Sequence, residues 1–183
     1  MNRPLQYLLI GLTALIAGEV RVPGLLADVR VLRDRWGVPH IYASSTGDLF
    51  MAQGYVHAQE RMWQMEVWRH ISAGRLSELF GAGSLDTDRF IRTLGWRGAA
   101  ERDLAAAGTA ARTALDAYAE GVNAWLDANR DQLGLAFVVT GADPEPYNDD
   151  PFALPRGTNM ADSARDPTMD PATLYREEIY TDR

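Results

Sequence analysis

The sequence predicts an α+β domain that is mostly helical, with short strands gathered near its N-terminus. Two observations carry this prediction. Apolar and polar residues alternate over parts of residues 20–43, which is the period of a half-buried strand. Further along, apolar residues recur at steps of three and four over two long stretches, which is the period of an amphipathic helix. The 183 residues are enough for one domain with a core of its own.

Two short strands are expected first, because the pair Pro23-Gly24 interrupts an alternation of valines with charged residues. The valines that define the two strands are Val20, Val22, Val29 and Val31. Trp36-Gly37 is predicted to form a turn, and residues 38–43 a third short strand.

A long helix is predicted over residues 48–72. Its start is marked by Ser45-Thr46-Gly47-Asp48, a segment that offers a hydroxyl group to cap the helix and an acid in the first turn. The apolar face is formed by residues at helical spacing, among them Leu49, Ala52, Val56, Trp63 and Val67.

Three further segments follow this helix. A short helix over residues 75–80 should end at Gly81. Residues 85–96 are rich in arginine and aspartate and are expected to form a polar connection. A second long helix is predicted over residues 99–129, with its apolar positions again three and four residues apart.

Residues 1–18 have the pattern of a signal peptide. Arg3 precedes about 12 apolar residues, which suits a secretory h-region and is shorter than the roughly 20 residues that span a bilayer. Export to the periplasm or the extracellular space is therefore expected. The cleavage site lacks two small residues at the usual spacing, so an uncleaved membrane anchor is the alternative.

Residues 19–150 are expected to form the domain, and residues 151–183 an acidic, proline-rich tail. Six of the nine prolines lie between Pro144 and Pro171. Residues 143–183 hold ten acids against four arginines, a net −6 out of the −7 of the whole chain. Such a composition is typical of irregular or disordered structure.

Composition excludes several classes of function. A net charge of −7 and a pI near 4.9 argue against a nucleic-acid partner, which requires a basic face. The absence of cysteine excludes thiol catalysis and zinc–thiolate sites. The absence of lysine excludes Schiff-base chemistry.

No freestanding catalytic constellation stands out. The three histidines, His40, His57 and His70, lack the spacing of a zinc site and are interpreted as structural. The helical glutamates Glu60, Glu66 and Glu78 have arginines nearby, namely Arg61, Arg69 and Arg75. These are interpreted as ion pairs rather than as acid–base catalysts.

Six motifs occur in a fixed order along residues 20–150. They are Arg33-Asp34-x-x-Gly37-Val38-Pro39-His40-Ile41-x-Ala43, Gly54-Tyr55-Val56-x-Ala58-Gln59-x-Arg61-x-x-Gln64-Met65-Glu66, Gly74-Arg75-Leu76-x-Glu78-Leu79-x-Gly81, Asp88-x-x-x-Arg92, Tyr118-Ala119-x-Gly121-Val122-Asn123-Ala124-Trp125 and Pro144-Glu145-Pro146-Tyr147. In content and order they resemble the α chain of the penicillin acylases and acyl-homoserine-lactone acylases.

The resemblance implies an N-terminal nucleophile hydrolase with a four-layer αββα fold, of which this chain is the α-chain portion. In that family a precursor cuts itself, and the freed N-terminal serine of the β chain attacks an amide carbonyl with its own α-amine as the base. An oxyanion hole stabilises the tetrahedral intermediate, and no cofactor takes part in catalysis.

On this basis the complete enzyme is expected to remove an acyl group from a small N-acyl amide, such as a β-lactam or an acyl-homoserine lactone. The partner is the β chain, and this chain alone should be inactive. Its helices should expose apolar surface where the β chain packs. The alternative is a non-catalytic, exported helical protein with a binding or scaffold role.

Three residues of the tail are candidate site residues. Thr158 follows a glycine, as the family's nucleophile does, but the 26 residues from Thr158 to Arg183 are too few to form two sheets. The resemblance instead suggests that residues 157–170 belong to the late α chain. Met160 would then contribute to the acyl pocket, and Asp170 would be a carboxylate ligand of a structural calcium ion, which prefers oxygen ligands.

Overall fold

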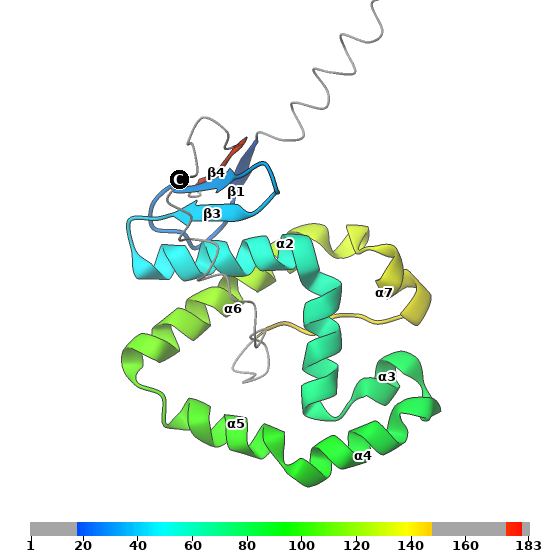
Figure 1. Ribbon diagram of the computed structural model, residues 1–183. Coiled ribbons are helices and arrows are strands. Elements are labelled where there is room, and N and C mark those ends of the chain that lie inside the picture. The colour runs from blue at the N-terminus through cyan, green and yellow to red at the C-terminus, as the bar shows by residue number, and fades with distance from the viewer. Residues whose placement is uncertain (1–17, 148–174, 181–183) are drawn as a thin grey trace, which may run out of the picture.

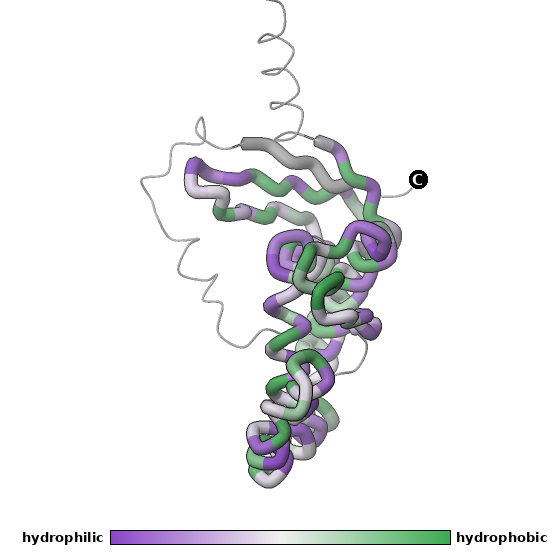
Figure 2. Tube along the Cα trace, turned by 90° about the vertical axis from the view of Figure 1, so that its right-hand side faces the viewer, coloured by the Kyte–Doolittle hydropathy of each residue, from purple (hydrophilic) through white to green (hydrophobic). Residues whose placement is uncertain are grey.

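The computed structural model describes residues 18–147 and the backbone of residues 175–180. Within these limits the protein is an α+β structure, as the sequence predicts: four short strands form one sheet, and helices make up most of the rest (Figure 1). Turned by 90°, the helices form a thin layer with the sheet across one end (Figure 2).

The sheet contains β1 (Glu19–Arg21), β2 (Val29–Arg33), β3 (Pro39–Tyr42) and β4 (Tyr175–Tyr180). The first three strands confirm the prediction from the sequence. Their order in the sheet is β1-β4-β2-β3, so the last strand lies between the first two. β4 runs parallel to β1 and antiparallel to β2, and β2 and β3 are antiparallel.

β4 corrects the expectation of an irregular tail at this point of the chain. Its backbone pairs with the full length of β2, from Val29 opposite Ile179 to Arg33 opposite Tyr175. The partners of this strand lie more than 140 residues away in sequence, so no local pattern reveals the pairing.

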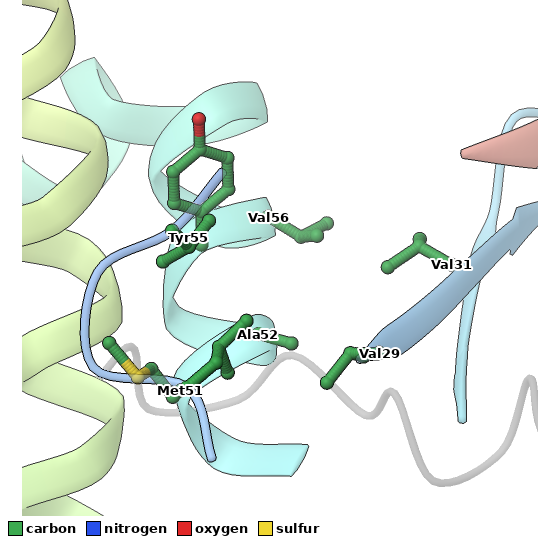
Figure 3. Close-up of a cluster of buried hydrophobic side chains, with 8 residues drawn as sticks. Val29, Val31, Met51, Ala52, Tyr55 and Val56 are labelled. Atoms are coloured by element: carbon green, nitrogen blue, oxygen red, sulfur yellow. The ribbon is translucent and has the colours of Figure 1, made fainter. Parts of the chain in front are cut away.

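The inner face of the sheet packs on α2 (Thr46–Ala73). Val29 and Val31 point from β2 toward Ala52 and Val56 of the helix (Figure 3). The two strand valines are fully buried, in agreement with the period-two alternation in the sequence. Burial of a valine side chain stabilises the fold by about 1.5–3 kcal/mol, so this contact fixes the sheet on the helix.

The helix α2 begins and ends as the sequence predicts. The hydroxyl of Ser45 accepts a hydrogen bond from the backbone N–H of Asp48, and the chain leaves the helix at Gly74 in a left-handed conformation. The backbone is not helical at Arg61, with φ −139° and ψ 22°, so α2 consists of two arms. The first arm lies under the sheet and the second turns toward α3 (Figure 1).

The polar connection expected over residues 85–96 is wrong, because most of it is helical. After α3 (Leu76–Phe80) and a short 3₁₀ turn (Ala82–Ser84), residues Leu85–Leu94 form α4. Two acids lie in its first turn and an arginine in its last, a distribution that suits the helix dipole. The high proportion of charged residues suggested a loop. It occurs in a helix because α4 buries only Asp88 and Ile91, so most of its positions face solvent.

The single helix expected over residues 99–129 is two helices, α5 (Trp96–Ala105) and α6 (Thr109–Asn129). They are separated at Gly108, whose backbone is extended at φ −67° and ψ 158° and which precedes the first turn of α6. Beyond α6, a 3₁₀ turn (Arg130–Gln132) and α7 (Leu135–Thr140) were not expected.

The helices α2 and α6 cross in backbone contact at two glycines. A Cβ atom added at Gly54 would lie 2.0 Å from the carbonyl oxygen of Tyr118, and one at Gly121 would lie 1.9 Å from that of Met51. A second apolar core surrounds this crossing and includes Met62, Val122, Leu126 and Phe137.

We expect Gly54→Ala to destabilise the protein by about 3 kcal/mol or more, because the methyl group meets rigid backbone and the two helices must separate. Urea unfolding followed by circular dichroism measures this. The control is Gly98→Ala inside α5, where the nearest atom, an Arg102 guanidinium nitrogen, lies 3.5 Å from the new Cβ. That change should be neutral or stabilising by up to about 1 kcal/mol. Equal effects of the two substitutions would contradict the close crossing.

Candidate functional site

The three residues predicted for the site, Thr158, Met160 and Asp170, lie outside the described residues. The structure does describe the segment that leads to them, Pro144–Tyr147, which we call the anchor segment. It has no helix or strand, yet Pro144 and Tyr147 are almost fully buried. Side chains from α2, α3 and α6 hold it in place.

Arg69 of α2 binds the anchor segment through its backbone. Its guanidinium donates hydrogen bonds to the carbonyl oxygens of Glu145, at 2.7 Å, and Pro146, at 3.1 Å. The same group lies over the ring of Tyr147, 4.7 Å from the centroid, as in a cation–π contact. One buried arginine therefore orients three consecutive residues.

Asn123 of α6 binds the segment from the other helix. Its side-chain amide donates to the carbonyl oxygen of Tyr147 at 2.6 Å and accepts from the backbone N–H of Tyr147 at 2.7 Å. This pair of bonds satisfies both backbone groups of a residue that is 1% exposed. The ring of Tyr147 packs in the core around the α2–α6 crossing.

A third contact comes from Arg75, at the start of α3. Its guanidinium binds both carboxylate oxygens of Glu145, at 2.9 and 3.2 Å, and also binds Glu78 at 2.7 Å. Hydrogen bonds from Arg75 lower the pKa of Glu78 and of Glu145, and the two carboxylates raise the pKa of Arg75. All three groups are therefore charged at neutral pH.

Glu66 lies beneath this cluster and is 1% exposed. Its carboxylate is 3.7 Å from Arg69 and 3.3 Å from His70. Burial raises the pKa of Glu66, although both neighbours oppose the shift. Its Oε2 accepts no hydrogen bond from the described residues, so the ion pair with Arg69 is its main compensation.

The motif Asp88-x-x-x-Arg92 has a structural explanation beside this cluster. Asp88 accepts hydrogen bonds from the backbone N–H groups of Leu76 and Ser77, at 2.7 and 2.9 Å, and so caps α3 from the neighbouring helix. Arg92 donates from Nε to the carbonyl oxygen of Gly74 at 2.8 Å. Together the two side chains of α4 fix the turn that carries Arg75.

The ion pairs expected for the helical glutamates are confirmed for Glu66 with Arg69 and for Glu78 with Arg75. The ion pair expected for Glu60 is also present. Its partner is Arg33 of β2, and Arg61 donates a hydrogen bond to Gln64.

Each histidine has a partner that suits a structural role. Nδ1 of His57 lies 2.8 Å from the hydroxyl of Tyr118 across the helix crossing, and burial lowers the pKa of His57. Nδ1 of His70 lies 2.9 Å from the carbonyl oxygen of Glu66, and His40 lies 3.7 Å from Asp34. Within residues 18–147 no group of three potential ligands could hold a metal ion.

Comparison with known proteins defines the class. The chain belongs to the penicillin amidase family, whose model matches residues 28–175. The penicillin acylase 2 proenzyme of Pseudomonas sp. (strain SE83) is 44% identical over 132 residues, which are 72% of this chain and 17% of that protein. An acyl-homoserine lactone acylase of Pseudomonas aeruginosa is 37% identical over 138 residues, 75% of this chain and 16% of that protein.

A solved structure agrees with this assignment. The thermostable penicillin G acylase from Alcaligenes faecalis matches with a TM-score of 0.63 at 30% identity, over 69% of this chain and 69% of that chain. The chain therefore resembles a large part of one chain of a solved acylase, but spans about one sixth of the length of the two curated relatives.

The sequence motifs contained Arg75, Asn123 and the anchor segment itself, but the connection between them was not evident. Arg69 falls just outside a motif, three residues after Glu66, and Asn123 and Tyr147 fall in different motifs. Asn123 is half-buried in the middle of α6, and nothing in the spacing of the motifs pointed to its bonds with Tyr147, 24 residues away.

We expect Asn123→Ala to lower the free energy of unfolding by about 2 kcal/mol or more, since it removes two side-chain hydrogen bonds to the backbone of the buried Tyr147. It should also make the chain after α7 more susceptible to limited proteolysis. Asn129→Ala is the control, because Asn129 bonds within α6 to the carbonyl oxygen of Trp125. If both variants are equally resistant to protease, Asn123 does not hold the anchor segment.

Asp88 gives a pH-dependent expectation. Burial alone would raise the pKa of Asp88, but hydrogen bonds from Ser77 and Leu76 and the charge of Arg92 lower it below the ordinary value of 3.8. Its contribution is therefore complete above that value and is lost as the pH falls through the lower, folded-state pKa.

Asp88→Ala should thus cost about 1–3 kcal/mol at pH 6, and the difference from wild type should shrink below about pH 4. Urea unfolding at a series of pH values measures it. Asp86→Ala, whose wild-type side chain is 95% exposed, is the control and should have little effect throughout. A difference that stays constant down to pH 2 would rule out the proposed capping carboxylate.

Proposed function

We propose that this chain is the α-chain portion of an acylase that hydrolyses the amide bond of a small N-acyl substrate, such as a β-lactam or an acyl-homoserine lactone. The observation that carries the proposal is the family match over residues 28–175, together with relatives that are named acylases. The nucleophile belongs to the β chain, the proposed partner, and this chain alone is inactive.

The anchor segment supports an α-chain role. Arg69, Asn123 and Arg75 fix the point from which the chain continues toward residues 157–170. In the proposal this later stretch carries Met160 at the acyl pocket and Asp170 as a carboxylate for a structural calcium ion. A nucleophilic role for Thr158 is the minor form of the proposal.

Apolar side chains on the surface support the proposal of a partner chain. Trp68, Phe80, Phe90 and Leu94 are 46–62% exposed, and Leu135, Val138 and Val139 are 73–76% exposed. Large exposed apolar residues of this kind mark contact sites with other chains. We propose that the β chain covers them and completes the four-layer αββα fold, of which residues 19–150 form the α-chain domain and residues 151–183 the late part.

The proposed enzyme is exported, with residues 1–18 as a cleaved signal or as a membrane anchor. No helix in residues 18–147 is long and apolar enough to cross a bilayer. N-terminal sequencing of protein from the periplasmic and membrane fractions distinguishes a cleaved signal from an anchor.

We expect the purified 183-residue chain to show no amide hydrolysis, because in this proposal the nucleophile and the oxyanion hole belong to the β chain. Co-expression with the β-chain part of the Pseudomonas penicillin acylase 2 should restore hydrolysis of a chromogenic acyl amide. The control is the same β-chain part alone. If the pure chain hydrolyses the amide and Thr158→Ala abolishes this activity, the proposal is replaced by its minor form, in which Thr158 is the nucleophile.

The competing function is a non-catalytic, exported binding or scaffold protein with the same fold. The two are distinguished by the DNA that follows the codon for Arg183. A continuing segment that encodes a Gly-Ser start and a long β-rich chain favours the enzyme, and its absence favours the scaffold.

A further inference from the structure

A hollow of about 510 Å³ opens on the surface where the end of α2 meets α4 and the start of α5. Six of the lining side chains give it its character: Ala73, Arg75, Ile91, Arg92, Trp96 and Arg97. Its size falls in the usual range of small-molecule sites, roughly 300–1,000 Å³. It shares Arg75 with the cluster around the anchor segment but lies on the side of α4 and α5.

The lining is basic in a protein that is acidic overall. Three of the lining residues are arginines and none is an acid, whereas the whole chain carries a net charge of −7. Arg75 is neutralised by Glu78 and Glu145, and Arg97 binds Glu101 at 3.0 Å through Nε. Arg92 forms no ion pair with any residue of the described part of the chain, although its charge acts on the carboxylate of Asp88, which is itself bound to backbone N–H groups of α3.

The guanidinium of Arg92 is held in position. Its Nε donates to the carbonyl oxygen of Gly74 at 2.8 Å, which leaves the two terminal nitrogens for other acceptors. A guanidinium fork of this kind matches the two oxygens of a planar carboxylate and forms strong, charge-assisted hydrogen bonds. Arg97, which also lines the hollow, adds a second cation.

Apart from the hydroxyl of Ser72, which donates to the carbonyl oxygen of Trp68, the rest of the lining is apolar. Ile91 is buried, Ala73 closes the α2 side, and the indole of Trp96 is 46% exposed at the start of α5. An exposed indole beside arginines provides a stacking surface next to an anion site. Strongly hydrated anions such as inorganic phosphate gain nothing from these apolar walls.

We propose that this hollow binds a small carboxylate with an aromatic or aliphatic body, with its carboxylate on Arg92 and Arg97 and its apolar part against Trp96 and Ile91. The site is separate from amide hydrolysis and is present in the chain as it stands. The arrangement of a fixed arginine fork beside an apolar wall carries the assignment.

Titration of the 183-residue chain followed by ¹H–¹⁵N NMR tests it, with the Trp96 indole signal assigned through Trp96→Phe. The probe is 3-phenylpropionate. Its neutral amide and inorganic phosphate are the comparison ligands. We expect a saturable shift of the Trp96 signal by the carboxylate, and binding at least tenfold weaker for the amide and for phosphate.

Arg92→Met should weaken binding of 3-phenylpropionate at least tenfold, and Arg97→Gln severalfold. If Arg92→Met lowers the stability of the protein, Arg97→Gln still tests the proposal. Arg97 is half exposed and, among the described residues, is paired only with Glu101 of the same helix, so its loss should not affect folding. Arg89→Gln is the matched control on α4, with a side chain 75% exposed and outside the lining, and should bind as wild type does.

Three results would overturn the proposal. If the neutral amide binds as tightly as 3-phenylpropionate, the hollow recognises only the apolar body. If phosphate binds as tightly, the hollow is a general anion site. No saturable shift up to about 10 mM carboxylate would mean that the hollow is simply solvated surface.

Discussion

The backbone contact between α2 and α6 is the constraint on which the rest of the structure depends. At Gly54 and Gly121 a carbonyl oxygen of each helix occupies the space where the other would carry a side chain. The sheet packs on the first arm of α2, so its place relative to α6 follows from the crossing. The pair formed by His57 and Tyr118 is also made possible by this approach.

The anchor segment depends on the same crossing through both of its helical contacts. Arg69 projects from the second arm of α2 and Asn123 from α6, and the two side chains bind adjacent peptide groups. A shift of one helix against the other by the width of a methyl group would break one set of these bonds. The two glycines of the crossing, which both lie in sequence motifs, therefore have a direct link to where the chain leaves the helices after Tyr147.

Structural elements that depend on local sequence pattern were predicted well, and contacts between residues distant in the sequence were predicted poorly. The strands around Val29 and Val31 and the cap at Ser45 follow from periodicity and hydrogen-bonding chemistry, and both were placed correctly. The helix α4 was not predicted because it has few buried positions and its many charged residues resemble those of a loop. The break at Gly108 was not predicted because alanines continue the helical pattern on both sides of it. The partners of Asn123 and of β4 lie far away in sequence, so composition and spacing contain no trace of them.

The position of β4 has a consequence for the order in which the protein can assemble. β2 and β3 are a local hairpin and can pair as soon as both have left the ribosome. β1 comes earlier in the chain, yet its neighbour in the sheet is β4, whose paired residues are made 159 positions later, as for Glu19 and Glu178. Closing a loop of that length carries a large entropic cost and slows folding. During synthesis the first strand must therefore wait for the last, while the helices between them are already able to form.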